Sequence, residues 1–433
     1  MKVTGEIRVP GDKSISHRAL LLGALGSGRS RVRGILDSAD VHSTANVLRA
    51  LGVDVPPLGP DITISGTGVD GIRQPTQPLD CGNSGTTARL VSGIAAASPG
   101  AARFVGDASL SRRPMRRVAR PLEAMGARFE FERADGLPMT VYGASLRSVH
   151  WSNETSSAQV KSAVLLAGVV AGVQVSVSEP RRSRDHTERM LASRGVWVEM
   201  SGTRVTVRRD APLAPADTDV PGDPSSAAFF VALAALASSG ELTVRDVGIN
   251  PTRTGFLDAL RQMGARIDIA DIRDGGGEPV ADVAVRPGML RGIEVGSEQV
   301  PALIDELPLL ACVASRAQGD TRITGAEELR VKESDRIGAV VANLRAVGAR
   351  VEELPDGMVI EGSDAPLTGR ITTHGDHRLA MAFGILGTLP GNQIVVDDPD
   401  CVAVSFPGFW RELDRVRSNA TRTRPAARAR ANG

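Results

Sequence analysis

The hydrophobic and polar positions of the chain form two patterns that recur along its length. In the first, apolar side chains cover nearly the whole circumference of a helix, as at Leu165, Val169 and Val170. Helices that are apolar all round are buried, so we expect these segments inside a core. In the second, a helix ends in glycine and an alternating strand follows, as at Gly264 and 265–269. Buried helices combined with strands indicate a mixed α/β fold.

The starts of the buried helices recur about every 70 residues, which indicates a repeat architecture. They lie near Ser16, Ser84, Ser157, Ser225, Asp305 and Asp376. The second type of helix recurs out of phase and ends at Gly52, Gly126, Gly195, Gly264 and Gly348. Each of these glycines suits a C-cap that requires positive φ, and the sixth copy, residues 409–416, lacks it. We interpret the chain as six strand–helix–strand–helix–strand units, three in each half.

The sequence Val-Pro-Gly-Asp occurs twice, at 9–12 and at 220–223, and serines and an apolar run follow each copy. Proline-glycine ends an extended segment, and serines before an apolar run start a helix. We therefore predict two copies of one domain that meet at these turns. Because ligands often bind in clefts between domains, we expect the site to lie there.

Composition limits the class of protein and its partners. The 433 residues, 42% of them hydrophobic, suffice for two domains. Lys and Arg total 51 against 50 Asp and Glu, so the net charge of +1 favours neither nucleic acid nor a membrane as a partner. Three widely spaced cysteines favour a reducing compartment. The first residues alternate like a strand rather than a signal peptide, so we expect a soluble cytoplasmic protein.

Basic side chains stand at three of the repeated helix starts, where acidic ones are preferred. Lys13 and Arg18 flank the first start, Lys332 and Arg336 flank a later helix start, and Arg378 follows the last. A cation at such a position opposes the helix dipole by about 0.3–1 kcal/mol. A solvated face explains one such case, but three repeat-related cases indicate an anionic ligand bound by helix ends and guanidinium groups. Further candidates for this set are Arg89 and Arg113.

Two acidic residues lie among these cations. Asp305, followed by Glu306, heads the fifth small-residue helix, and it can be an N-cap or a general base. Glu333, between Lys332 and Arg336, can be a paired structural acid or a proton carrier. The residues alone leave both alternatives open.

Two other motif matches are rejected on their context. Residues 66–71 fit Gly-x-Gly-x-x-Gly, but prolines within 72–78 exclude the helix that a dinucleotide site requires. His374 and His377 lack further ligands at metal-binding spacing. We therefore expect neither a dinucleotide nor a metal.

Several motifs together closely resemble those of the enolpyruvyl transferase family. Between about Lys2 and Trp410 they comprise 11–18 (GDKSISHR), 82–89 (GNSGTTAR), 113–115 (RPM), 157–159 (SAQ), 330–336 (RVKESDR) and 376–378 (DHR). The resemblance implies two similar domains, each of three βαβαββ units around buried helices. We expect an inserted domain at 11–220, a second domain made of 1–10 and 221–417, and a disordered tail at 418–433.

The resemblance also implies an activity. It is the transfer of the enolpyruvyl group of phosphoenolpyruvate to the 5-hydroxyl of shikimate 3-phosphate, with release of phosphate through a tetrahedral intermediate. Both substrates carry phosphate, which agrees with the anionic ligand inferred above. We expect small-molecule substrates, no cofactor and a monomer.

Residue by residue, the resemblance assigns two overlapping substrate sets. The residues implied for shikimate 3-phosphate are Lys13, Ser14, Arg18, Ser157, Ala158, Gln159, Arg184, Asp305 and Lys332. Those implied for phosphoenolpyruvate are Lys13, Gly85, Arg113, Gln159, Arg336 and Arg378. In this scheme Asp305 takes the proton of the 5-hydroxyl, and Glu333 with Lys13 protonates the methylene carbon and reverses that step.

Several positions depart from the commonest family pattern or affect specificity. Val404 stands where many members have lysine, so one cation for phosphoenolpyruvate is missing or replaced. Glu328 and His186 stand where others have asparagine and tyrosine, and Arg184 resembles an alternative contact of a divergent branch. Gly85 leaves room beside phosphoenolpyruvate and so predicts sensitivity to its analogue glyphosate.

Two alternative functions are open. One is the related transfer to UDP-N-acetylglucosamine, although the cysteine that usually precedes Arg-Pro is absent from 104–114. The other is a non-catalytic anion-binding or nucleic-acid-binding repeat protein, for which the chain lacks a basic excess and an aromatic stacking surface.

Overall fold

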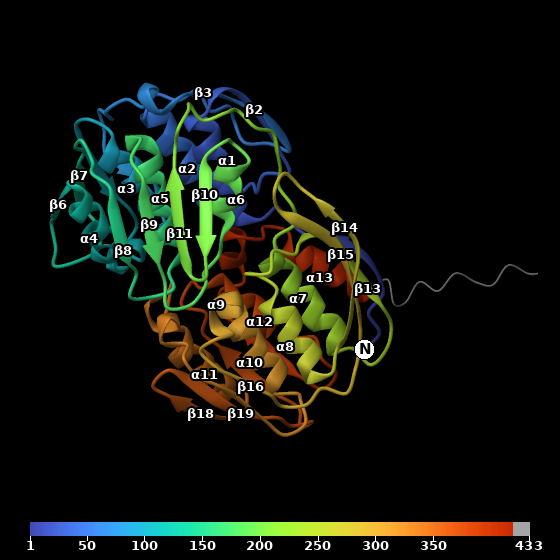
Figure 1. Cartoon of the computed structure of the whole chain (residues 1–433). Helices are drawn as coiled ribbons and strands as arrows, with labels where there is room; N and C mark the ends of the chain where they lie inside the picture. Colours follow the sequence, from blue (N-terminus) through green and yellow to red (C-terminus); the bar gives the residue numbers. More distant parts are fainter. Residues whose placement is uncertain (419–433) are drawn as a thin grey trace, which may run out of the picture.

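The computed structural model describes residues 1–418, so the predicted disordered tail lies outside the described residues apart from the backbone of residue 418. Figure 1 shows two lobes, one formed by the blue-to-green part of the chain and the other by the yellow-to-red part. The N-terminal strand β1 (Gly5–Arg8) belongs to the second lobe, where it pairs parallel with β13 (Leu242–Gly248). The predicted mixed α/β class is confirmed.

Residues 79–142 of the first lobe form one complete repeat. Its elements are β4 (Leu79–Asp80), α3 (Gly85–Ala97), β5 (Ala101–Val105), α4 (Arg116–Met125), β6 (Arg128–Phe131) and β7 (Met139–Tyr142). They form a sheet of order β4-β5-β7-β6, in which β4 and β5 are parallel and β6 and β7 antiparallel. This is the expected βαβαββ unit.

Of the other two units of the first lobe, one follows the same plan and the other varies it. One consists of β8 (Val149–Ser152), α5 (Ala158–Ala171), β9 (Val175–Ser178), α6 (His186–Ala192), β10 (Trp197–Ser201) and β11 (Arg204–Arg208). The other consists of α1 (Lys13–Leu25), β2 (Ser27–Arg33), α2 (Ala39–Ala50), β3 (Asp61–Thr67) and β12 (Thr218–Asp219). Although β12 follows the other elements of this unit along the chain, it takes the place of the unit's first strand and pairs parallel with β2.

The second lobe has two corresponding units and a third that is shorter than the expected βαβαββ unit, because its sheet has two strands within the described residues. The first consists of β1, α7 (Pro224–Ala235), β13, α8 (Gly255–Met263), β14 (Arg266–Asp274) and β15 (Pro279–Arg286). The second consists of β16 (Glu294–Val295), α9 (Val300–Leu303), α10 (Leu307–Ala314), β17 (Asp320–Ile323), α11 (Arg336–Ala346), β18 (Arg350–Leu354) and β19 (Gly357–Glu361). The last consists of β20 (Thr368–Ile371), α12 (His377–Gly387), β21 (Gln393–Val396) and α13 (Phe409–Ser418). Short 3₁₀ turns are η1 (Val69–Gly71), η2 (Leu110–Arg112), η3 (Ile304–Glu306), η4 (Glu327–Val331) and η5 (Asp400–Val404).

Each lobe has its own hydrophobic core. The first core lies within residues 15–220, and the second within residues 3–7 and 227–416. This division supports the boundaries that we propose for domain 1 (11–220) and domain 2 (1–10 and 221–417).

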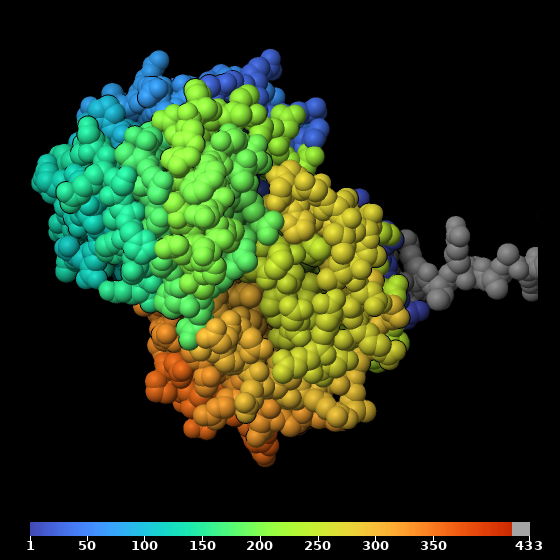
Figure 2. Space-filling model, in the orientation of Figure 1, coloured from blue at the N-terminus to red at the C-terminus, as the bar shows by residue number. Residues whose placement is uncertain are grey.

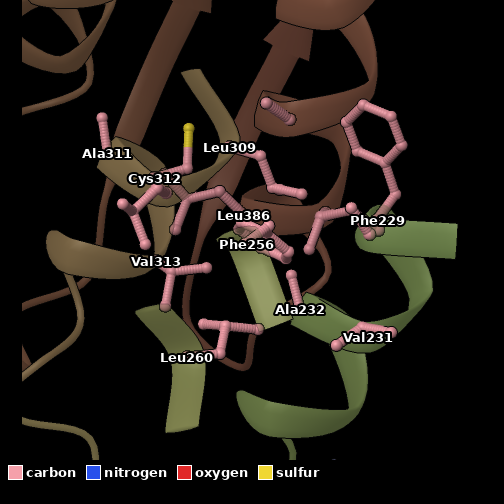
Figure 3. Close-up of a cluster of buried hydrophobic side chains, with 14 of the residues drawn as sticks. Phe229, Val231, Ala232, Phe256, Leu260, Leu309, Ala311, Cys312, Val313 and Leu386 are labelled. Atoms are coloured by element: carbon pink, nitrogen blue, oxygen red, sulfur yellow. The ribbon is translucent and has the colours of Figure 1, made fainter. Parts of the chain in front are cut away.

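The apolar helices form the centres of these cores, as their sequence predicts. In domain 1, α3 packs against α5, and in domain 2, α7, α10 and α12 pack together. Figure 3 shows Phe229 of α7, Leu309 of α10 and Leu386 of α12 in the core of domain 2. Packing therefore explains the alanines and glycines of these helices. We expect functional residues at the ends of the helices instead.

The two Val-Pro-Gly-Asp segments lie side by side where the chain passes between the domains. The N–H of Asp12 donates to the carbonyl of Pro221 (2.7 Å), and the N–H of Asp223 donates to that of Pro10 (2.9 Å). Each aspartate also caps the helix that follows it, α1 or α7. The repeated turns therefore bring the starts of α1 and α7 together.

The helix boundaries confirm one sequence prediction and correct another. All five glycines that end the second type of helix have positive φ, between 82° and 121°, as a C-cap requires. The fifth helix start is different, because Asp305 lies in η3 between α9 and α10 rather than at a cap. The N-cap alternative for Asp305 is therefore wrong.

Candidate active site

A cleft of about 330 Å³ lies between the two domains. In the space-filling view the domains meet where the green surface borders the orange one (Figure 2). Twelve of the site residues singled out from the sequence line this cleft: Lys13, Ser14, Gly85, Arg113, Ser157, Ala158, Gln159, Arg184, Asp305, Lys332, Glu333 and Arg378. Residues more than 350 positions apart thus share one site.

Two predicted site residues, Arg18 and Arg336, do not line the cleft. Arg18 is only 4% exposed. Its guanidinium donates to the hydroxyls of Thr187 (2.7 Å) and Ser162 (2.9 Å) and to the carbonyl of Ser14 (2.9 Å). Burial is the main cause that lowers the pKa of Arg18 to about 10, so it remains charged behind the wall of the cleft.

Five of the six helix starts expected from the sequence face the cleft. The residues that lie in the first turns of α1, α3, α5, α7 and α12 and line it include Lys13, Gly85, Ala158, Ser225 and Arg378. The positive dipole ends of these helices favour anions, although the N–H groups of Lys13, Ser225 and Arg378 already donate to capping aspartates. The sixth expected helix start is η3, which instead places the acidic side chain of Asp305 there.

Asp305 lies among four cations. Arg184 of domain 1 donates to its carboxylate, and Arg336, Arg378 and Lys332 of domain 2 lie 3.4, 3.6 and 3.9 Å from its oxygens. Burial disfavours the charged carboxylate, but these four cations outweigh burial and hold the pKa of Asp305 well below its usual range. Asp305 is therefore ionised and shares its charge with cations from both domains.

Glu333 is the second acid of the cleft. Its carboxylate lies 2.7 Å from Arg336 and 3.6 Å from Arg113 across the cleft. Burial opposes ionisation here too, but Arg336, Arg113, His377 and Lys332 hold the pKa of Glu333 well below its usual range. Glu333 is therefore a paired acid, which was one of the two alternatives that the sequence left open. It also lines the cleft, so the other alternative, a proton carrier, stays open.

Arg336 joins these two acids from behind the cleft wall. It is 1% exposed, and its Nε and Nη2 donate to the two oxygens of Asp376 at 2.8 and 3.2 Å. Asp376 in turn caps α12 by accepting from the N–H of Arg378 (3.0 Å). Arg336 therefore fixes Asp305, Glu333 and the start of α12 relative to one another.

Lys13 is held by an acid that the sequence did not reveal. Its Nζ donates to Asp40 of α2 at 2.7 Å. Asp40 is 7% exposed, and its second carboxylate oxygen has no partner among the described residues. In sequence Asp40 is an ordinary first-turn acid of a helix, so only the packing of α2 against α1 shows its role.

Further residues of the site also emerge only in three dimensions. Arg117 pairs with Glu328 across the cleft at 2.6 Å. Arg89, a weak sequence candidate, is 5% exposed and donates to Oε1 of Gln159 (2.5 Å). Burial and the nearby Arg117 lower the pKa of Arg89 to about 9. These contacts tie the walls of the cleft to each other.

Three expectations from the sequence concern features that should be missing: a cation at position 404, a metal site and a membrane-spanning helix. Val404 lies in η5 and does not line the cleft, whereas its neighbour Ser405 does. Residues 1–418 contain no group of three or more His, Cys, Asp or Glu placed to hold a metal ion. Within the same residues, no helix has the length and apolar character that crossing a membrane requires.

Two buried histidines beside the cleft are expected to make stability depend on pH. Burial is the main cause that lowers the pKa of His17 and of His377 to about 3. An unfolded histidine titrates near 6.5, so between pH 6.5 and 3 the unfolded chain binds more protons than the folded one. We expect the free energy of unfolding to fall as the pH drops below 6.5, by about 1.4 kcal/mol per pH unit for each histidine.

Urea denaturation at pH 7 and pH 5 measures this effect. The variant His17→Gln is expected to reduce the pH dependence by about half, because one of the two neutral histidines is gone. Equal stability of the unsubstituted protein at both pH values would contradict the expectation.

Solved structures place this architecture in a known class. An EPSP synthase from Acinetobacter baumannii superposes with a TM-score of 0.84 at 40% identity, over 96% of each chain. The enolpyruvyl transferase NikO from Streptomyces tendae shares the fold, with a TM-score of 0.76 at 18% identity over 96% of this chain and 95% of that one. The fold of the chain is therefore that of the enolpyruvyl transferases.

Sequence comparison narrows this class to one family. The family model of EPSP synthase (3-phosphoshikimate 1-carboxyvinyltransferase) matches residues 1–413. A 3-phosphoshikimate 1-carboxyvinyltransferase from Sulfurihydrogenibium sp. is 46% identical over 96% of this chain and 97% of its own length. One from Acidithiobacillus ferrooxidans is 50% identical over 94% of each. The chain belongs to the EPSP synthase family, which confirms the resemblance found in the sequence.

Proposed function

We propose that the cleft is where this chain transfers the enolpyruvyl group of phosphoenolpyruvate to the 5-hydroxyl of shikimate 3-phosphate. The products are 5-enolpyruvylshikimate 3-phosphate and phosphate, and the reaction is the family's step in the shikimate pathway to chorismate and aromatic amino acids. The observation that carries the proposal is the ionised Asp305 among four cations from both domains. A base for the hydroxyl group and anchors for two phosphates then lie in one place.

We assign shikimate 3-phosphate to the wall made by α1, α5 and the segment before α6, together with Asp305. The lining residues assigned to it are Lys13, Ser14, Ser157, Ala158, Gln159, Arg184, Asp305 and Lys332. Arg18 is also assigned to it, but its position behind the wall means that it acts through the carbonyl of Ser14. Serine hydroxyls, N–H groups and cations together suit a phosphate.

We assign phosphoenolpyruvate to the neighbouring part of the cleft, between α3 and α12. The lining residues assigned to it are Lys13, Gly85, Arg113, Gln159 and Arg378. Arg336 contributes from behind through Glu333 and Asp305. Guanidinium groups bind carboxylate and phosphate in pairs, which suits a small molecule that carries both.

The chemistry follows from the placement of the two acids. Asp305 takes the proton of the 5-hydroxyl while the oxygen of that hydroxyl bonds to C2 of phosphoenolpyruvate. C3 receives a proton from Lys13 or Glu333. The bond from C2 to the phosphate oxygen then breaks, phosphate leaves, and C3 returns a proton to Lys13 or Glu333. Because phosphoenolpyruvate binds Arg113, it draws the positive charge of Arg113 away from Glu333 and raises the pKa of Glu333, which allows Glu333 to carry this proton.

Phosphate release tests the proposal directly. With phosphoenolpyruvate and shikimate 3-phosphate we expect steady release of phosphate, and with UDP-N-acetylglucosamine as acceptor we expect none. Release with UDP-N-acetylglucosamine alone would establish the alternative transferase. Binding of shikimate 3-phosphate without any release would establish a non-catalytic anion-binding protein.

Gly85→Ala is expected to weaken phosphoenolpyruvate binding selectively. A Cβ at this position would lie 2.7 Å from Nη1 of Arg89 and 3.5 Å from Nη1 of Arg113. Both atoms end flexible side chains, so the fold tolerates the change but the guanidinium groups move. We expect KM for phosphoenolpyruvate to rise about tenfold, a change of about 1.4 kcal/mol, and KM for shikimate 3-phosphate to stay within about twofold.

A matched control is Gly296→Ala, because a Cβ at Gly296 meets nothing within 4 Å.

The same geometry at Gly85 underlies the expected sensitivity to glyphosate, which should compete with phosphoenolpyruvate. Undiminished turnover with glyphosate in large excess over phosphoenolpyruvate would refute that sensitivity.

We further propose that the protein acts as a monomer in the cytoplasm. The cleft draws its residues from both domains of a single chain, so a second copy is not needed to complete it. Analytical ultracentrifugation tests the monomer, and a dimer that persists at nanomolar concentration would contradict it.

A further inference from the structure

The loop of residues 250–254, between β13 and α8 of domain 2, lies buried against domain 1. Asn250, Thr252 and Arg253 are 2%, 8% and 4% exposed. Oδ1 of Asn250 accepts from the N–H (2.9 Å) and the hydroxyl (2.8 Å) of Thr252, which fixes the turn. The amide NH₂ of Asn250 and the guanidinium of Arg253 are left to contact domain 1.

Asn250 reaches the start of α6. Its Nδ2 donates to Asp185 of domain 1 at 2.7 Å and to Glu278 of domain 2 at 2.9 Å. Glu278 also contacts Nδ1 of His186 at 2.7 Å. All four side chains are nearly inaccessible, between 1% and 2% exposed. Figure 2 shows the yellow surface around the β14–β15 hairpin against the green surface of domain 1. Domain 2 therefore holds the segment that directly follows Arg184.

Arg253 reaches the start of α1. Its Nη1 donates to Asp12, the N-cap of α1, at 3.0 Å. Its Nη2 donates to Asp223 at 3.2 Å and to the hydroxyl of Ser225 at 2.8 Å. The N–H of Lys13 donates to the same Asp223 at 3.2 Å. One arginine thus pairs with both capping aspartates at the passage between the domains.

We propose that loop 250–254 is a positioning element by which domain 2 sets the places of Arg184 and Lys13 in domain 1. Asn250 acts on Arg184 through Asp185, and Arg253 acts on Lys13 through Asp12 and Asp223. The inference rests on the proposed function, because that function gives Arg184 to shikimate 3-phosphate and Lys13 to both substrates. Asn250 and Arg253 are therefore positioning residues with different expected effects on the two substrates.

Asn250→Ser isolates the first contact. A serine hydroxyl can still accept from the N–H two residues on and keep the turn, but it is too short to replace the amide between Asp185 and Glu278. We expect KM for shikimate 3-phosphate to rise about tenfold, with KM for phosphoenolpyruvate and kcat within about threefold. The matched control is Asn392→Ser, since Asn392 bonds to the backbone of Leu367 and Leu386 within domain 2.

The control separates positioning from stability. If loop 250–254 only stabilises the fold, Asn250→Ser and Asn392→Ser both lower the midpoint of urea denaturation and both leave KM unchanged, and the inference is overturned. A rise of both KM values to the same extent in Asn250→Ser overturns it as well.

Arg253→Lys tests the second contact without burying unpaired carboxylates. Lysine keeps the positive charge beside Asp12 and Asp223 but cannot bridge them in the fork geometry of a guanidinium. We expect KM for both substrates to rise about fivefold or more, in contrast to Asn250→Ser. A change in kcat alone would overturn the inference. Inactivity of the unsubstituted protein with both substrates would instead refute the proposed function, so the two failures are distinguishable.

Discussion

Asp305→Asn is expected to lower kcat by about 1,000-fold, within the range that a positioned general base contributes. The amide keeps the size of the side chain but cannot take the proton of the 5-hydroxyl. At the same time Arg184, Lys332, Arg336 and Arg378 lose the negative charge that they share. We therefore expect both anionic substrates to bind at least as tightly as before, so that kcat falls while the dissociation constants do not rise.

Single-turnover kinetics and equilibrium titration with each substrate measure the two effects separately. We also expect Asp305→Asn to be less stable than the unsubstituted protein in the absence of ligand, because four close cations repel one another. Inorganic phosphate should restore the stability of this variant. Glu298→Gln is the control, since Glu298 is a rim acid that pairs with Arg181 outside the cation group. Normal turnover in Asp305→Asn would refute the role of Asp305 as the base.

Lys13→Met is expected to reduce kcat/KM for both substrates by about 1,000-fold or more, because one cation serves both anions and the proton transfer. The substitution also removes the sole hydrogen-bonding partner that the described residues give the carboxylate of Asp40. We expect a loss of about 2–3 kcal/mol in the free energy of unfolding from the buried carboxylate. Activity and stability are thus both expected to fall.

The double variant Lys13→Met, Asp40→Asn separates these losses. Asparagine removes the unpaired charge, so urea denaturation should show most of the stability restored. The activity should stay low, since no cation has returned to the start of α1. Recovery of activity together with stability would mean that Lys13 serves only the fold, contrary to the proposed function.

Much of the fold could be predicted from the sequence because its signals are local. The glycines at helix ends adopt the positive φ that their position requires, and the all-apolar helices occupy the two cores. The duplicated Val-Pro-Gly-Asp turn marked the place where the domains meet. The strand β12 was harder to place, because it pairs with a strand nearly 190 residues earlier in the chain.

The site was predicted less completely. Predicted site residues such as Lys13, Asp305 and Arg378 do meet in the cleft. Arg18 and Arg336 stand behind its wall, which their position in the motifs does not indicate. Asp40 and Arg253 could not be assigned a role from sequence, because each looks like an ordinary charge near a helix start until its partner from a distant segment is known.

The sequence by itself determined most of the elements and the internal repeat, since caps, turns and apolar periodicity act over a few neighbouring residues. It also predicted an anionic ligand. Only the tertiary structure decided which charges face each other. Asp305 lies in a 3₁₀ turn rather than at a helix cap, and Arg184 from the other domain completes its group of cations. Interactions between charges depend on distance and burial in space, and both quantities are fixed only when the two domains pack together.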